Sequence, residues 1–154
     1  MKEYKLNELV DVFDSMRRPL LTMTRQRIKG PFPYYSANGI IDHINESIFR
    51  GEYILVAEDG SVRTEDGHPV VKLTKPNESF WVSNHAHVFR AKTGFLNRYL
   101  YYCLTQANID QCVTGAVQLK VSQENLLNLK LSIHEPAEQQ HIVDTTSSHR
   151  QESF

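Results

Sequence analysis

The stretch that decides the fold lies between Gly30 and Gly60 and contains two motifs: Pro33-Tyr34-Tyr35-Ser36-Ala37-Asn38-Gly39-Ile40 and Gly51-Glu52-Tyr53-Ile54-Leu55-Val56-Ala57-Glu58-Asp59-Gly60. Asn38-Gly39 is a strong turn signal because both residues tolerate a positive φ. Residues 53–57 form an apolar strand pattern that ends in an acidic turn. A basic segment precedes the first motif, so the arrangement predicts a rigid loop that carries aromatic and amide groups beside positive charge.

The composition is typical of a globular protein with one domain. The chain has 154 residues, of which 40% are hydrophobic and 23% are charged. A domain of this size buries ~70% of its unfolded surface, so it needs no disulfide or metal to fold. Cys103 and Cys112 therefore fit reduced thiols, which favours a cytoplasmic location. No apolar run approaches the ~18 residues of a membrane span, and we expect no membrane association.

The basic segment at residues 15–29 is the best candidate for contact with nucleic acid. The net charge of the chain is −1, so any such contact must come from a local patch. The segment contains no acidic residue, and its basic residues are Arg17, Arg18, Arg25, Arg27 and Lys29. A solvated loop and a phosphate-contacting arm are both open interpretations, and the adjacent aromatic turn favours the arm.

The rest of the chain predicts short strands joined by turns, with few helices. Residues 4–14 fit a short helix or turn, although their alternation leaves a strand open. Ser122 is expected to cap a helix, and residues 135–143 are expected to open another, followed by a frayed polar tail. The remaining expected elements are strands at 40–44, 48–49, 53–57, 70–73 and 129–133 and a helix over 95–112.

Residues 80–89 are expected to form one strand with His85 and His87 on the same face. Two histidines on one face are compatible with a metal site, or with imidazoles that hydrogen-bond to neighbouring backbone. We favour the second interpretation because no cysteine or carboxylate lies nearby in the sequence. A small metal-dependent nuclease using His85, His87 and Asp59 is therefore a minor hypothesis.

The motifs of common catalytic sites are absent from the sequence. It contains no glycine-rich dinucleotide fingerprint, no phosphate loop and no nucleophile elbow. Glu58 and Asp59 are adjacent on a strand end and would point to opposite faces. By contrast, Gln118 and Lys120 follow a glycine turn, where glutamine can pair with adenine and lysine with guanine or phosphate. An ordinary solvated loop remains the alternative for these two residues.

Three further motifs follow the first two in order: Phe80-Trp81-Val82-Ser83-Asn84-His85-Ala86-His87-Val88, Tyr99-Leu100-Tyr101-Tyr102 and Thr114-Gly115-Ala116-Val117-Gln118-Leu119-Lys120. Together the five motifs resemble the target recognition domain of a type I restriction–modification specificity subunit. The resemblance covers about residues 4–143.

This resemblance implies an α+β fold with one twisted, mostly antiparallel sheet, flanking helices and a truncated C-terminal spacer helix. It implies a domain that reads one half of a split target in double-stranded DNA. In the family, a full subunit carries two such domains and works with adenine methyltransferase subunits and a restriction subunit. S-adenosylmethionine, ATP and Mg²⁺ are expected on those partners, and no cofactor or catalytic activity is expected on this chain.

The resemblance also indicates domain limits and site residues. The recognition domain is expected at 1–134, and the start of the spacer helix with a polar tail at 135–154. No catalytic or metal-binding residue is expected. The expected DNA contacts are Tyr35, Ser36, Asn38, His87, Gln118 and Lys120, with Arg25, Arg27 and Lys29 contacting phosphates.

The chain departs from the family pattern in two ways. It carries one recognition domain, and its helix turns polar after Val143. A truncated gene product, a half subunit that forms a homodimer, and a fragment are all open interpretations. The alternative function is a truncated, inactive remnant, or a protein-interaction domain that does not read DNA alone.

Overall fold

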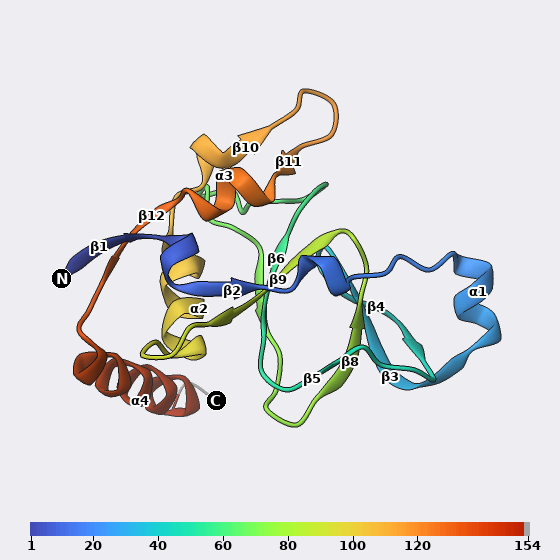
Figure 1. Ribbon diagram of the computed structural model, residues 1–154, viewed down its shortest axis with the longest axis horizontal. Helices are drawn as coiled ribbons and strands as arrows, with labels where there is room; N and C mark the ends of the chain where they lie inside the picture. Colours follow the sequence, from blue (N-terminus) through green and yellow to red (C-terminus); the bar gives the residue numbers. More distant parts are fainter. Residues whose placement is uncertain (153–154) are drawn as a thin grey trace.

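The computed structural model describes the backbone of residues 1–152 and the side chains of residues 1–146 (Figure 1). Among the described residues, helices accompany strands that pair almost entirely antiparallel, and the one parallel pair joins β3 (Lys29–Ser36) to β8 (Ser79–Val82). The predicted α+β class is therefore confirmed. The described residues form two main sheets where the sequence predicted one.

The first sheet is wholly antiparallel and packs against the main apolar cluster. Its strands, in spatial order, are β2 (Val10–Val12), β9 (Ala86–Ala91), β6 (Ile54–Ala57) and β7 (Val71–Leu73). All four residues of β6 are buried, which agrees with its unbroken apolar sequence. One face of this sheet packs against α2 (Asn97–Gln106) through a large apolar cluster that includes Ile54, Phe89 and Leu104.

The second sheet lies beside the first and extends toward the end of the molecule that carries α1 (Thr22–Arg27) (Figure 1). Its strands, in spatial order, are β4 (Gly39–Ile44), β3 (Lys29–Ser36), β8 (Ser79–Val82) and β5 (Phe49–Arg50). Phe49 and Phe80 stack with ring centroids 5.4 Å apart, and Tyr35 meets Phe80 edge-on at 5.5 Å. This aromatic cluster also contains Leu55 and Val88 of the first sheet, so it joins the two sheets.

The predicted strand over residues 80–89 is wrong, and its break explains why there are two sheets. β8 ends at Val82 in the second sheet, and β9 begins at Ala86 in the first. Between them the Ser83 hydroxyl accepts a hydrogen bond of 3.2 Å from the His85 N–H, a local turn that competes with strand pairing. The chain therefore crosses from one sheet to the other at Ser83–His85, and the predicted alternation of faces does not continue through it.

Short elements complete the fold. The 3-10 helices are η1 (Leu6–Glu8), η2 (Asp14–Met16) and η3 (Asp110–Cys112), and the remaining α-helices are α1 (Thr22–Arg27), α3 (Gln123–Leu127) and α4 (Pro136–Glu152). Two antiparallel pairs are formed by β1 (Lys2–Lys5) with β12 (Lys130–Ile133), and by β10 (Val113–Thr114) with β11 (Lys120–Val121). Among residues 1–152 no helix combines the length and apolar character needed to cross a membrane.

Several local predictions can be compared directly with these elements. Ser122 caps α3 as predicted, since its hydroxyl accepts from the Asn125 N–H at 3.1 Å. Residues 4–14 combine strand and 3-10 helix, and the helix predicted over 95–112 is shorter. α4 continues to Glu152 where a frayed tail was expected after Val143, while residues 153–154 lie outside the described residues. The proposed domain boundary at residue 134 stays a prediction.

Candidate nucleic-acid interface

Four loops that are far apart in the sequence lie side by side and form one surface. They are the β3–β4 turn, the turn at 58–61, the β8–β9 turn and the β10–β11 loop, and we call them together the loop surface. The Asn38 side chain donates to the Ser61 carbonyl at 2.9 Å, and the Ser83 N–H donates to the Tyr35 carbonyl at 2.9 Å. The Glu58 N–H donates to the His85 carbonyl at 2.9 Å and the Gly60 N–H to the Leu119 carbonyl at 3.0 Å. These bonds fix the four loops relative to one another.

The loop surface presents polar side chains to solvent. Asn38, Gln118 and Lys120 are exposed and Ser36 is half-buried, so the structure brings together four of the predicted contacts. Amide, hydroxyl and ammonium groups of this kind hydrogen-bond to base edges and phosphates. Their shared position on fixed loops makes this surface the best candidate interface.

Tyr35 and His87 do not belong to the exposed part of this surface. Their exposed fractions are 1% and 0%, so neither side chain faces solvent and their burial argues against direct DNA contact. Tyr35 packs in the aromatic cluster, and its hydroxyl donates to Glu78. Burial and the nearby Glu78 carboxylate raise the pKa of Tyr35, so it stays neutral.

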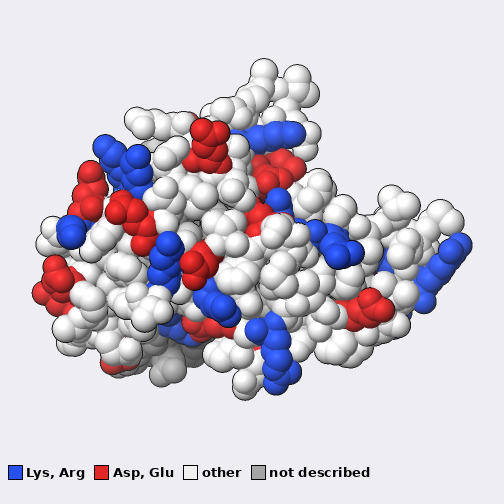
Figure 2. All heavy atoms as spheres, in the orientation of Figure 1, with Lys and Arg blue, Asp and Glu red and all other residues white. Residues whose placement is uncertain are grey.

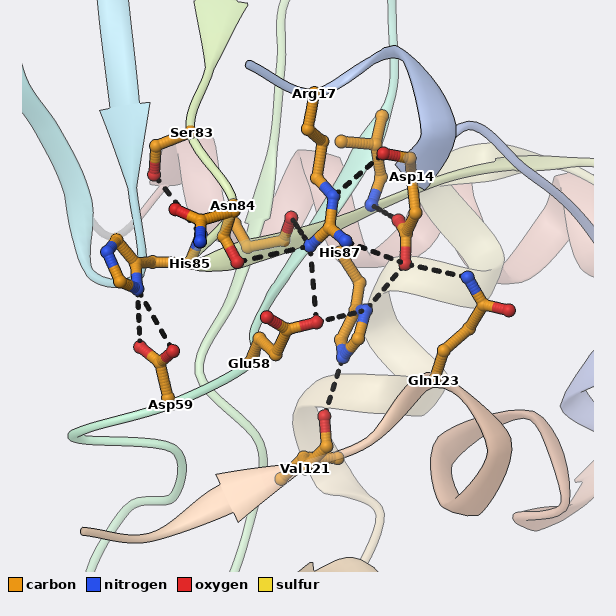
Figure 3. A network of polar contacts seen from close by, with 12 residues as sticks. Asp14, Arg17, Glu58, Asp59, Ser83, Asn84, His85, His87, Val121 and Gln123 are labelled. Atoms are coloured by element: carbon orange, nitrogen blue, oxygen red, sulfur yellow. Dashed lines mark hydrogen bonds and ion pairs between the residues drawn. The ribbon is translucent and has the colours of Figure 1, made fainter. Parts of the chain in front are cut away.

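Exposed His85 is a further candidate for DNA contact, which the sequence did not indicate. It lies in the β8–β9 turn, and its side chain is 46% exposed. Asp59 fixes the ring, because its carboxylate lies 2.8 Å from Nδ1 (Figure 3). The broken strand explains the error: a continuous strand would have placed His85 and His87 on the same face.

The basic segment is divided between structural and exposed residues. Arg25 pairs with Asp42 at 3.0 Å and stacks over the Tyr34 ring at 4.8 Å, with 13% of its side chain exposed. Its predicted phosphate contact is therefore revised to a supporting role in the β3–β4 hairpin. Lys29 also pairs with Asp42, at 2.5 Å, but its side chain is 57% exposed. The Lys29 hydrogen bond lowers the pKa of Asp42, which keeps this carboxylate charged.

Arg27 is exposed on α1 and remains the strongest candidate for phosphate contact. On the face shown in Figure 2, basic and acidic side chains are interspersed, and basic side chains also lie at the α1 end. With mixed charges on this face and a net charge of −1, a phosphate contact would depend on a few local cations such as Arg27.

A polar network lies directly beneath the loop surface (Figure 3). His87 contacts Asp14 through Nδ1 at 2.7 Å and the Val121 carbonyl through Nε2 at 2.6 Å. Asp14 also accepts from the Val88 N–H at 2.7 Å and from the Gln123 side chain at 3.0 Å. Arg17 donates to Glu58 at 3.2 Å and lies 3.9 Å from Asp14.

Burial alone would raise the pKa of Asp14, but hydrogen bonds from His87, Gln123 and the Val88 N–H outweigh it and lower the pKa. For His87, burial alone would lower the pKa. Its hydrogen bonds to Asp14 and Val121, with the charges of Asp14 and Glu58, outweigh the effect of burial and raise the pKa of His87. The network is therefore an ion-paired cluster in which the charged forms of Asp14 and His87 stabilise each other.

Asp14, Glu58 and His87 also form a group whose ligand atoms lie within 4.8 Å of one another. Such a set can hold a metal ion, but here Arg17 supplies positive charge between the carboxylates, and both His87 nitrogens face acceptors. The donor set therefore fits a charge network better than a divalent cation. The nuclease set from the sequence is not assembled, because His85 pairs with Asp59 whereas His87 pairs with Asp14.

These features define a small α+β domain that presents a polar loop surface over a buried charge network. The family profile described as the type I restriction modification DNA specificity domain matches residues 1–153. The chain belongs to this family, which confirms the resemblance carried by the five motifs.

Related proteins agree with this assignment. The chain is 32% identical over 138 residues to a Haemophilus influenzae protein assigned as a type I restriction enzyme specificity subunit, covering 90% of this chain and 34% of that protein. It thus spans about a third of that relative's length.

Two solved structures share the fold. A type I restriction–modification S subunit from M. genitalium matches with a TM-score of 0.75 at 16% identity, over 97% of this chain and 39% of that one. The HsdS subunit from Thermoanaerobacter tengcongensis matches with a TM-score of 0.60 at 15% identity, over 98% and 37%.

Proposed function

We propose that this chain is the DNA-reading module of a type I restriction–modification specificity subunit and recognises one half of a bipartite target. The observation that carries the proposal is the loop surface, where four hydrogen-bonded loops present amide, hydroxyl, imidazole and ammonium groups together. Fixed donors and acceptors discriminate between base edges, because a wrong base leaves some of them unpaired.

In this proposal the base contacts are Ser36, Asn38, His85, Gln118 and Lys120, and the phosphate contacts are Arg27 and Lys29. The Asp59 carboxylate orients His85 so that Nδ1 donates to it, which leaves Nε2 for a base or a phosphate. Tyr35 and Arg25 support the loops from within, because Tyr35 is buried in the aromatic cluster and Arg25 pairs with Asp42.

The module itself is proposed to be non-catalytic and to work in the cytoplasm. Adenine methyltransferase subunits would bring S-adenosylmethionine, and a restriction subunit would bring ATP and Mg²⁺. α4 is the segment that would connect to those partners, or to a second copy of this chain, because it begins directly after β12 and packs beside α2.

The test is selection from a randomised duplex DNA pool by the purified chain across a salt series. We expect enrichment of one short motif, with affinity that falls steeply as salt rises. Salt-sensitive binding without enrichment would show that base reading needs a partner. No binding at low salt would contradict the proposal and favour the alternative, a fold retained without autonomous DNA reading.

A further inference from the structure

The β10–β11 loop, which carries Gln118, is held to the rest of the domain through the strand that follows it. The Val121 carbonyl accepts from His87 at 2.6 Å, and the Val121 N–H donates to the Glu58 carbonyl at 2.6 Å. Asp59 and Lys120 form a β-bridge beside these bonds. Gln123, two residues after Val121, reaches Asp14 in the same network. His87 is therefore a buried polar side chain that helps to join the loop to the core, together with Val121, which is packed in the main apolar cluster.

The hydrogen-bond partners of His87 define its protonation state. Nδ1 faces the Asp14 carboxylate and Nε2 faces a backbone carbonyl, and both of these groups accept hydrogen bonds only. A neutral imidazole has a single N–H, so the lone pair of its other nitrogen would face an acceptor oxygen at 2.6 or 2.7 Å, and both contacts therefore require the imidazolium. The ring is fully buried and stacks on Phe89 with centroids 5.9 Å apart, which leaves no solvent partner for either nitrogen.

The charges around His87 match this state. Asp14 comes from η2 and Glu58 from the end of β6, with Glu58 Oε1 at 3.6 Å from Nδ1. Arg17 is the other cation that faces these two carboxylates, so two positive groups balance two negative groups among the described residues. The raised pKa of His87 agrees with this balance.

We propose that His87 is a positioning residue that holds the β10–β11 loop in its base-reading conformation only while both ring nitrogens are protonated. Loss of one proton at alkaline pH would break the bond to Asp14 or to Val121 and loosen the loop, which the backbone bonds of Val121 and Leu119 would then hold without it. The inference rests on the proposed function for its DNA readout. Contacts by Arg27 and Lys29 lie on other elements and persist, so discrimination between sequences falls while sequence-independent binding remains.

The first test is independent of DNA and uses the whole chain. Long-range ¹H–¹⁵N spectra of the imidazole are expected to show two protonated nitrogens for His87 at neutral pH and one at alkaline pH. Over the same range the amide protection factors of Val121 and Gly60, corrected for intrinsic exchange, are expected to fall, whereas that of Ile54 in the core stays high. A singly protonated His87 at neutral pH would overturn the proposal.

The second test measures affinity for the selected duplex and for a scrambled duplex from about pH 7 to about pH 9. We expect the ratio of the two affinities to fall by about tenfold or more, the size of one lost base contact. His87→Gln is expected to show a low ratio at every pH, and His141→Gln on α4, which is exposed, is the matched histidine control.

The outcomes separate the two claims. If neither the affinity ratio of the two duplexes nor the amide protection of the loop changes with pH in the unaltered chain, the positioning role of His87 is wrong. This result does not depend on whether the His87→Gln variant folds. If no duplex is ever preferred but the imidazole and amide signals change together as expected, the proposed base reading fails and the loop-holding role stands.

Discussion

At Gly115 the backbone leaves no room for a side chain. An added Cβ would lie 2.2 Å from the Gln118 carbonyl oxygen, and φ is +97°. Gly94 has the same φ, but an added Cβ there meets nothing within 4 Å. The two glycines therefore separate the effect of backbone strain from the effect of a blocked loop.

We expect Gly94→Ala to lower the free energy of unfolding by about 1–3 kcal/mol through the positive φ alone, with DNA affinity unchanged. Gly115→Ala carries the same strain and must also open the β10–β11 loop, so we expect it to lose base discrimination. Urea unfolding and duplex binding of both variants measure the difference. Equal DNA binding by the two alanine variants would mean that the loop conformation is not needed for reading.

Asp14 and His87 make the stability of the domain depend on pH in opposite directions. The lowered pKa of Asp14 gives a contribution that is present above its ordinary value of 3.8 and is lost as pH falls through the folded-state value. The raised pKa of His87 gives a contribution that is present below its ordinary value of 6.5 and is lost as pH rises through the folded-state value. Between pH 3.8 and pH 6.5 both groups therefore contribute fully to the free energy of unfolding.

We therefore expect the free energy of unfolding to fall on the alkaline side of this window in the unaltered chain. His87→Gln should remove the part of that fall that comes from the imidazolium. Urea unfolding across pH measures it, with His141→Gln as the control. If the free energy of unfolding falls equally with rising pH in the His87→Gln and unaltered proteins, the assignment of a doubly protonated His87 is contradicted.

At the scale of elements, α2 is the helix that anchors the first sheet. Leu104 is fully buried in the apolar cluster beneath the helix. We expect Leu104→Ala to cost about 2–5 kcal/mol, because it leaves a cavity in a packed core. Gln106→Ala on the exposed side of the same helix should change stability by less than about 0.5 kcal/mol. A Leu104→Ala cost within that smaller range, measured by urea unfolding, would contradict this account of the core.

Elements with a local cause were predictable, and elements decided by tertiary contacts were not. The Ser122 cap and the apolar strand β6 follow from neighbouring residues, and both are confirmed. The break between β8 and β9 was missed because residues 80–89 alternate as one strand would, whereas their two halves pair in different sheets.

The candidate site follows the same division. Ser36, Asn38, Gln118 and Lys120 were expected at turns, where side chains are usually exposed. Asn38 and Gln118 lie on loops, Ser36 and Lys120 are the adjoining strand residues, and all except half-buried Ser36 are exposed. Partners distant in sequence could not be inferred: Asp42 lies 17 positions from Arg25, and Asp14 lies 73 positions from His87. Because Arg25 and His87 pair with these carboxylates, they have structural roles. The local sequence around Arg25 and His87 gives no sign of either pairing.

At the scale of the whole molecule, a net charge of −1 means that the proposed DNA binding depends on a few local cations. We expect Arg27→Ala to weaken binding to all sequences alike and to reduce the slope of log affinity against log salt by about 0.9. Arg98→Ala on α2 makes the same charge change on another element and should leave the slope unchanged. Equal effects of the two substitutions would indicate general electrostatics without a phosphate contact at Arg27.

The loop surface is proposed to read bases. The most direct measurement is selection from the randomised duplex pool by the unaltered chain, by Gln118→Ala and by Lys5→Ala on β1 as a control. We predict one enriched motif for the unaltered and control proteins, and a motif relaxed at one position for Gln118→Ala, with about 1–3 kcal/mol of discrimination lost there. An identical motif from all three proteins would show that Gln118 does not read bases. The absence of any motif from the unaltered chain would contradict autonomous reading by this domain.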